Sequence, residues 1–138
     1  MINKKKKILI LGSTGSIGKS SLNVIKNYKN KLKIVCLSSN KNYKKLYNQS
    51  KLFNVKKLII NNKNTLIKAK KYFKKKNIKI YPNVNEYLKK NKNKIDLVIV
   101  GISGLEGLKP TLDIIPHTKN LASANKESII CGWKFIRN

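Results

Sequence analysis

A seven-residue segment near the N-terminus, Gly12-Ser13-Thr14-Gly15-Ser16-Ile17-Gly18, has the residue types and spacing of a phosphate-binding loop. Glycines allow a tight turn and let backbone N–H groups approach a pyrophosphate closely. The helix expected next would offer its N-terminal N–H groups and dipole to the phosphates. Thr14 and Ser16 add hydroxyl donors. The segment therefore predicts a dinucleotide site, with a plain tight turn as the alternative; a Walker loop is excluded because its glycines lie farther apart.

The residues after the second predicted strand bear on which dinucleotide binds. An NAD-specific site places an acid there to hold the ribose 2′-hydroxyl. No Asp or Glu occurs from Leu37 to Phe53, and Lys41 lies within Ser38–Asn42. A cation without a carboxylate suits a 2′-phosphate, which favours NADP over NAD. The alternative is that Lys41 is one more surface lysine.

Two later segments are also suited to ligand binding. The glycine-rich stretch Gly101–Thr111 follows an aliphatic strand, and loops at the carboxyl ends of parallel strands line the ligand crevice. A flexible turn is the alternative there. Asn125, Lys126 and Glu127 offer an amide, an ammonium and a carboxylate to one crevice, or form a helix start with Glu in its first turn.

Short aliphatic runs alternate with longer amphipathic segments, and this alternation positions the three loops. It predicts an α/β fold: a Rossmann-like, doubly wound, mainly parallel sheet with helices on both faces, in a single domain over residues 1–138. In the first helix we expect Ile17, Ser21, Val24 and Ile25 to face inward. The expected strands are Lys7–Leu11, Lys33–Leu37, Lys57–Ile60, Ile78–Tyr81, Ile95–Val100 and Leu121–Ser123. The expected helices are Gly15–Asn27, Tyr43–Phe53, Asn64–Lys75, Val84–Lys90, Gly107–Ile115 and Glu127–Ile136.

Composition limits the remaining classes of protein. The 138 residues fit one domain, no apolar run is long enough for a membrane span, and no targeting leader is evident, so we expect a cytoplasmic protein. Cys36 and Cys131 lack metal-type spacing and are expected to be buried, reduced thiols. The net charge of +27 comes almost entirely from lysine, accompanied by abundant Asn and Ile. This pattern favours compositional bias over specific nucleic-acid binding, although non-specific affinity for polyanions at low salt would follow from either.

Three segments together resemble one enzyme family. Gly12–Gly18 (GSTGSIG), the loop from Gly101 with its Gly-Leu-Lys-Pro-Thr, and Ala124–Gly132 (ANKESIICG) are similar to the N-terminal domain of 1-deoxy-D-xylulose 5-phosphate reductoisomerase. They occur in the family's order and at about its separations, so the resemblance covers essentially the whole chain. It implies an NADPH-dependent oxidoreductase of the methylerythritol phosphate pathway of isoprenoid biosynthesis. The implied reaction rearranges 1-deoxy-D-xylulose 5-phosphate and reduces the aldehyde to 2-C-methyl-D-erythritol 4-phosphate, with Mg²⁺, Mn²⁺ or Co²⁺ on the substrate oxygens.

The resemblance also implies roles for individual residues. Lys126 would contact the phosphosugar substrate. Asn40 stands where the family often has glycine, and asparagine tolerates positive φ better than most residues. The residues implied to bind NADPH are Thr14, Gly15, Ser16 and Ile17 at its phosphates, Asn40, Lys41 and Asn42 at its adenosine 2′-phosphate end, and Asn125 and Glu127 elsewhere on the cofactor.

In the family the metal ligands, the substrate-phosphate site, the lid and the C-terminal helical domain follow the segment that this chain matches. The acids of this chain are scattered along it: Glu86, Asp96, Glu106, Asp113 and Glu127. We therefore expect no metal site, no catalytic residue and no turnover from this chain alone. The family is homodimeric, and we expect a monomer here; His117 is expected in a loop. Another NADP-dependent oxidoreductase and a basic nucleic-acid-binding module are the competing hypotheses.

Overall fold

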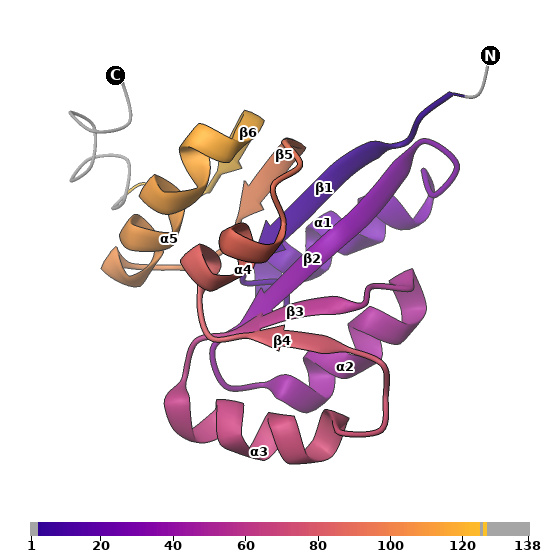
Figure 1. Ribbon diagram of the computed structural model, residues 1–138. Helices are drawn as coiled ribbons and strands as arrows, with labels where there is room; N and C mark the ends of the chain where they lie inside the picture. The colour runs from indigo at the N-terminus through magenta and orange to yellow at the C-terminus, as the bar shows by residue number, and fades with distance from the viewer. Residues whose placement is uncertain (1–2, 125, 127–138) are drawn as a thin grey trace.

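The computed structural model describes residues 3–124 and 126, which form one six-stranded sheet with helices packed against it (Figure 1). The sheet order is β4-β3-β2-β1-β5-β6, and every neighbouring pair is parallel. The strands are β1 (Lys6–Leu11), β2 (Leu32–Ser39), β3 (Lys57–Ile60), β4 (Lys79–Tyr81), β5 (Ile95–Val100) and β6 (Thr118–Ser123). The helices are α1 (Ser16–Lys26), α2 (Tyr43–Phe53), α3 (Lys63–Phe73), α4 (Val84–Lys90) and α5 (Leu108–Ile114), with 3₁₀ turns η1 (Leu105–Gly107) and η2 (Ile115–His117) around α5.

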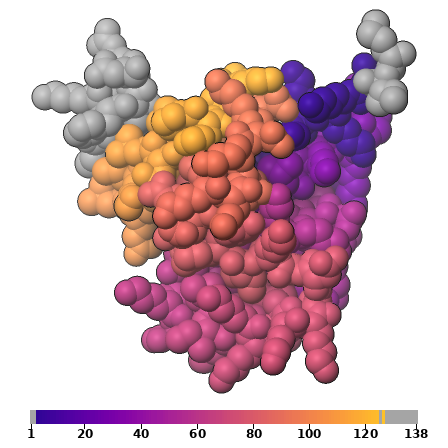
Figure 2. Space-filling model, viewed as in Figure 1, coloured from indigo at the N-terminus to yellow at the C-terminus, as the bar shows by residue number. Residues whose placement is uncertain are grey.

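Helices cover both faces of the sheet. Alternate residues of β1 point to opposite faces, so they belong to two different cores. Ile8 and Ile10 belong to a core that includes side chains of α1, α2 and α3. Leu9 and Leu11 belong to a second core with α4 and α5. In the view of Figure 2 the salmon and orange segments, which include α4 and α5, lie at the surface of the molecule. The predicted doubly wound α/β fold with helices on both faces is confirmed.

The order of the strands reverses between β1 and β5. From β1 the chain adds β2, β3 and β4 toward one edge of the sheet, and then returns to place β5 and β6 on the other side of β1. Connections on the two sides leave the sheet toward opposite faces at such a point, so the loops after β1 and β5 separate and leave a crevice. Those two loops belong to the glycine-rich segments Gly12–Gly18, which runs into α1, and Gly101–Gly107, which ends with η1.

The inward face of α1 differs from the predicted one. The buried residues are Gly18, Leu22 and Ile25, whereas Ile17 is 40% exposed and Val24 is 60% exposed. The prediction was wrong for Ile17 and Val24, and it did not place the buried Gly18 on the inward face. Gly18 packs against the backbone of the preceding loop, and this contact sets the rotation of the helix.

The last described strand begins three residues earlier than predicted. β6 starts at Thr118, which pairs with Ile95, and not at Leu121. The early part of β6 is polar and partly exposed at the edge of the sheet, so it carries no aliphatic signal.

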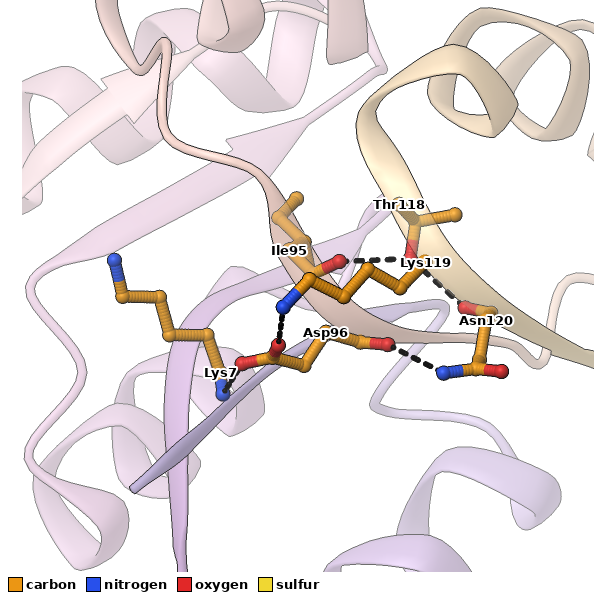
Figure 3. Close-up of polar contacts among 6 residues, drawn as sticks. All are labelled: Lys7, Ile95, Asp96, Thr118, Lys119 and Asn120. Atoms are coloured by element: carbon orange, nitrogen blue, oxygen red, sulfur yellow. Dashed lines mark hydrogen bonds and ion pairs between the residues drawn. The ribbon is translucent and has the colours of Figure 1, made fainter. Parts of the chain in front are cut away.

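A carboxylate fixes the amino ends of three strands, as Figure 3 shows. Asp96 of β5 accepts a hydrogen bond from the backbone N–H of Lys7 in β1 at 2.8 Å. The same carboxylate forms an ion pair with Lys119 of β6 at 2.9 Å, and Asn120 donates to the Asp96 carbonyl at 3.2 Å. These contacts lie at the end of the sheet opposite the crevice, so Asp96 has a structural role.

Cys36 is fully buried in β2, as expected, and burial raises the pKa of its thiol. Cys131 and the predicted helix Glu127–Ile136 lie outside the described residues. His117 ends the 3₁₀ turn η2 and does not lie in an irregular loop. In the described part of the chain, every helix is too short or too polar to cross a membrane.

Candidate functional site

The glycine loop packs at distances that only glycine permits. Gly12, at the end of β1, has φ +78°, and a Cβ there would lie 3.0 Å from backbone atoms of Gly101 and Ile102. A Cβ on Gly18 would lie 2.4 Å from the Gly12 carbonyl oxygen and from Ser13 Cα. The two glycines therefore bring the loop, the first turn of α1 and the loop after β5 together at the crevice.

Polar contacts hold this loop in one conformation. The Gly12 N–H donates to Ser38 Oγ at 2.8 Å, and the Ser13 N–H donates to the Ser38 carbonyl at 2.9 Å. Ser13 is fully buried; its hydroxyl donates to Gln49 Oε1 at 2.8 Å, and Gln49 Nε2 donates back to the Ser13 carbonyl at 2.9 Å. These bonds fix the backbone of Gly12 and Ser13 before any ligand arrives, which reduces the ordering cost of binding.

Two cavities lie along the crevice and meet at Gly15. The β2-side cavity, of about 490 Å³, is bounded by the ends of β1, β2 and β3 and by the loop after β5. The β6-side cavity, of about 280 Å³, is bounded by the start of α1, the end of β5 and the residues after β6. Gly15, Gly101, Ile102 and Ser103 line both cavities. An elongated ligand could lie in both cavities with its middle on Gly15.

The start of α1 is suited to an anion at that middle position. Gly15 is the N-cap residue of α1 and no side chain caps the helix. The first N–H groups of such a helix need an acceptor from solvent or a ligand, and the helix dipole favours negative charge there. The first turn of α1 contains no acidic residue that could play this part.

Most of the residues expected at the cofactor line one of the two cavities. Thr14, Gly15 and Asn40 line the β2-side cavity. Gly15, Ser16, Ile17 and Lys126 line the β6-side cavity, and the exposure of Ile17 noted above follows from this position. The loop after β5 faces the crevice through Gly101, Ile102 and Ser103, as its place after a parallel strand predicted. Asn125 and Glu127 lie outside the described residues.

Of the three residues after β2 that were expected at the 2′-phosphate, only Asn40 lines a cavity; Lys41 and Asn42 do not. Asn40 does not need a positive φ: among the described non-glycine residues only Asn54 and Asn77 have one. Lys41 is exposed and lines neither cavity. Asn42 caps α2, since its Oδ1 accepts from the Lys45 N–H at 3.2 Å while its own N–H donates to Ser39 Oγ at 3.2 Å. Its side-chain oxygen is thus engaged by the helix.

Sequence reasoning missed several residues that shape the crevice. Ser38 and Gln49 hold the glycine loop, and Asn61 and Glu106 line the β2-side cavity. Asn61 follows β3, so its place at a carboxyl end was a usable signal. The hydrogen bond from Ser13 to Gln49 joins residues 36 positions apart, so no local sequence pattern predicts it.

Among the described residues there is no group of three or more His, Cys, Asp and Glu side chains that could hold a metal ion. A further cavity, of about 640 Å³, lies beside α4 and α5 and includes His117, Asp113 and Glu106 in its lining. It adjoins the β2-side cavity, because Asn61, Glu106 and Pro110 line both. No residue of the glycine loop lines this cavity, so the candidate dinucleotide site is the pair of cavities that Gly15 lines.

Comparisons with known proteins agree with this geometry. Residues 8–132 match the family model described as 1-deoxy-D-xylulose 5-phosphate reductoisomerase. An enzyme of that name from Pelagibacter ubique (strain HTCC1062) is 52% identical over 134 residues, which are 96% of this chain and 34% of the relative. One from Clostridium novyi (strain NT) is 39% identical over 95% of this chain and 35% of the relative. The chain thus spans only 34% and 35% of the lengths of these two relatives.

Solved structures show the same similarity. The structure described as 1-deoxy-D-xylulose 5-phosphate reductoisomerase from Zymomonas mobilis in complex with NADPH matches with a TM-score of 0.84 and 28% identity. The match covers 97% of this chain and 36% of that chain. A reductoisomerase structure described as a complex with magnesium matches with a TM-score of 0.80 and 25% identity, over 97% of this chain and 35% of that one.

Proposed function

Because the chain belongs to the 1-deoxy-D-xylulose 5-phosphate reductoisomerase family, we propose that it is the NADPH-binding part of such an enzyme. The observation that carries the proposal is the meeting of two cavities at Gly15 and Gly101, where the strand order reverses. Dinucleotides bind at this position in doubly wound sheets, with their pyrophosphate on the first glycine loop.

The pyrophosphate would lie on Gly15, with the N–H groups at the start of α1 donating to it. The hydroxyls of Thr14 and Ser16 would add donors, and Ile17 would contact the cofactor from the β6-side cavity. Under this proposal the adenosine half lies in the β2-side cavity and the nicotinamide half in the β6-side cavity. Asn125 and Glu127 are proposed to contact the cofactor.

The preference for NADPH over NADH rests on the residues after β2. Of the described acids, only Glu106 lines the β2-side cavity, and it comes from the opposite wall, after β5. The ends of β1 and β2 contribute serine, threonine, glycine and asparagine. Lys41 is exposed just beyond Asn40, where its flexible side chain is free to reach a 2′-phosphate at the rim. Asn42 would contribute through its amide nitrogen.

The complete enzyme is proposed to rearrange 1-deoxy-D-xylulose 5-phosphate and to reduce the resulting aldehyde to 2-C-methyl-D-erythritol 4-phosphate. NADPH supplies the hydride for the reduction. Lys126 lines the β6-side cavity, so its ammonium group would bind the phosphosugar and neutralise negative charge that develops on a substrate oxygen. The described residues do not fit a divalent metal, and we propose that the metal ligands come from parts of the enzyme other than this segment.

Assembly and location are also proposed from the family. A homodimer is proposed for the complete enzyme, and a monomer for these 138 residues. The site of action is proposed to be the cytoplasm. A specific nucleic-acid role is not proposed, because the lysines are spread along the whole chain.

A calorimetric titration of the chain with NADPH, and in parallel with NADH, tests the proposal. We expect saturable binding of NADPH and at least roughly tenfold weaker binding of NADH, since the 2′-phosphate adds charge-assisted hydrogen bonds. Lys41→Gln should reduce this preference, whereas Lys26→Gln, on the last turn of α1, should not. Equal affinity for both cofactors would contradict the proposal, as would an affinity that collapses with salt in the steep manner of non-specific polyanion binding.

A second experiment concerns turnover. The chain with NADPH, Mg²⁺ and 1-deoxy-D-xylulose 5-phosphate should show no oxidation of NADPH, followed by its absorbance. Sustained oxidation that depends on the sugar phosphate would show that these residues suffice for catalysis and would overturn this part of the proposal.

A further inference from the structure

Lysines gather at the amino ends of the first four strands, at the end of the sheet opposite the glycine loop. Lys7 of β1 is aligned with Lys33 of β2, and Lys57 of β3 is aligned with Lys79 of β4. Aligned residues of neighbouring strands point to the same face of the sheet, so the members of each pair lie side by side. Like charges at such short range repel each other, and an anion bound between them would relieve the repulsion.

Two adjoining cavities, of about 460 Å³ and about 540 Å³, contain these lysines and lie beside the end of α4. Lys57, Lys90 and Asn91 line both of them, so the two form one concave surface, which we call the amino-end cavity. The lysines that line it are Lys7, Lys33, Lys57, Lys79, Lys90 and Lys92. By contrast, the β2-side cavity has no lysine in its lining and the β6-side cavity has only Lys126. The abundant lysine of this chain is therefore not spread evenly over its cavities.

The positive charge of the amino-end cavity is not balanced by acids within the described residues. No described acid lines it, and the described ion pairs all use other lysines, namely Lys89, Lys109 and Lys119. Asp96 lies nearby in β5, but its carboxylate accepts from the Lys7 N–H and pairs with Lys119. The cavity beside α4 and α5 differs in this respect, because acids accompany the lysines in its lining. An anion is thus the ligand that the amino-end cavity favours.

One ammonium group of the cavity is held in place by a hydrogen-bond chain. Lys57 is partly buried, and its Nζ donates to Asn91 Oδ1. Asn91 Nδ2 in turn donates to the Tyr87 carbonyl at 2.8 Å and to the Tyr81 hydroxyl at 3.3 Å, so the amide is fixed at both of its ends. An ammonium group has three N–H donors, and the bond to Asn91 leaves two of them for a ligand.

We propose that the amino-end cavity is a second ligand site of this chain and that it binds a linear oligophosphate. Neighbouring strands are about 4.8 Å apart, so the lysines from β1 to β4 extend over roughly 14 Å. A single phosphate reaches only one or two of them, whereas linked phosphates reach several at once. Lysine binds phosphate as a point charge, and its flexible side chain follows such a chain of charges. The phosphates are either inorganic or carried by a nucleoside, and the chemistry of recognition is the same.

The site is independent of the proposed cofactor site. None of its lining residues lines either cavity at Gly15, and the two sites lie at opposite ends of the parallel strands. An oligophosphate and a dinucleotide would therefore bind at the same time, so the two can be tested separately.

The test is a titration of the chain with inorganic tripolyphosphate at about 0.15 M salt, followed by calorimetry and by the chemical shifts of the backbone amides. We expect saturable binding that shifts the amides of Lys33, Lys57 and Asn91 most strongly. Orthophosphate should bind at least about tenfold more weakly, because it makes fewer charge-assisted hydrogen bonds. ATP in a parallel titration separates the two sources: equal affinity indicates recognition of the phosphates alone, and tighter binding indicates a nucleoside triphosphate.

Charge-removing variants locate the site. Lys33→Gln and Lys90→Gln should each weaken tripolyphosphate by about threefold to tenfold; both side chains are exposed, so the folded structure should be retained. Lys56→Gln is the matched control, since it removes the same charge from an exposed lysine next to Lys57 that does not line the cavity. It should change the affinity by less than about twofold. All three variants should keep the NADPH affinity of the wild type.

Several outcomes would overturn the inference. One is an equal loss of affinity in Lys33→Gln, Lys90→Gln and Lys56→Gln, which would indicate attraction to the net charge alone. Another is binding that disappears at about 0.15 M salt, or shifts confined to the glycine loop. Tighter binding of a short oligouridylate than of tripolyphosphate at these amides would instead indicate a nucleic-acid surface. None of these outcomes bears on NADPH binding, and a chain that binds tripolyphosphate as expected but does not bind NADPH would overturn only the proposed function.

Discussion

Gly15 and Gly18 belong to one glycine-rich segment, but their replacement by alanine should have different effects. Gly15→Ala should reduce cofactor affinity, and Gly18→Ala should reduce stability. A Cβ on Gly15 would lie 3.6 Å from the Gly12 carbonyl oxygen and 3.8 Å from the Gly101 carbonyl oxygen, which are ordinary contacts. Its φ of −79° is one that alanine adopts readily. Alanine is a poorer N-cap than glycine, but it also restricts the unfolded chain, so Gly15→Ala should change the free energy of unfolding by less than about 1 kcal/mol.

The new methyl group should nevertheless reduce cofactor binding. Gly15 lines both cavities at the point where they meet. A phosphate oxygen that accepts from an N–H here must come within about 2.9 Å of the nitrogen, and a neighbouring Cβ takes up that space. We expect the NADPH affinity of Gly15→Ala to fall by roughly tenfold to a hundredfold, a loss of one or two hydrogen bonds to a charged group.

Gly18→Ala should act on stability. Its Cβ would lie 2.4 Å from the Gly12 carbonyl oxygen and Ser13 Cα, and 2.6 Å from the Ser13 carbonyl carbon. These are backbone atoms, so α1 and the loop would have to separate by about 1 Å to reach van der Waals distance. Overpacking of this kind costs about 1–3 kcal/mol, and the better helix propensity of alanine offsets up to about 1 kcal/mol of it.

Urea denaturation and calorimetric titration of both variants measure the two effects. We expect wild-type stability with weak NADPH binding for Gly15→Ala, and a lower urea midpoint for Gly18→Ala. Wild-type affinity in Gly15→Ala would refute the placement of the pyrophosphate on Gly15. Wild-type stability in Gly18→Ala would refute the close contact between α1 and the loop.

Two further predictions concern stability. Ser38→Ala removes the acceptor of the partly buried Gly12 N–H, so the free energy of unfolding should fall by about 1 kcal/mol in urea titrations, and an unchanged midpoint would contradict the assigned bond. For Asp96, hydrogen bonds from the Lys7 N–H and then from Lys119 lower the pKa of the carboxyl group. A lowered folded-state pKa gives stability that is present at neutral pH, begins to be lost below about pH 4 and is gone below the folded pKa. Asp96→Asn should therefore lower the melting temperature at pH 7 and reduce its fall in acid; an unchanged pH profile would contradict the role shown in Figure 3.

The fold was largely predictable because buried parallel strands consist of continuous aliphatic runs. Lys57–Ile60 and Ile95–Val100 were predicted with the bounds that the structure has. The polar edge strand β6 was shortened in the prediction, since half of its residues face solvent and hydrogen bonds to β5 define its start. The face of α1 was misassigned because a glycine contact, not an aliphatic side chain, determines which side packs.

The candidate site was predictable where it depends on position along a strand. Thr14 and Gly15 follow β1, Gly101 follows β5, and each lines the crevice as a residue at a carboxyl end should. Contacts between helices could not be predicted in this way. Lys45 reaches the Thr14 carbonyl across 31 residues, and in a chain with 32 basic residues nothing local distinguishes it from the others.

The most direct test of the central claim is to map NADPH onto the chain by the chemical shifts of its backbone amides. We expect saturating NADPH to perturb the amides of Gly12–Ile17 and of Gly101–Ser103 most strongly, because these segments line the two cavities that meet at Gly15. Perturbations concentrated instead on the lysine-rich helix α3, with the glycine loop unchanged, would contradict it and indicate non-specific binding of an anion to a basic surface.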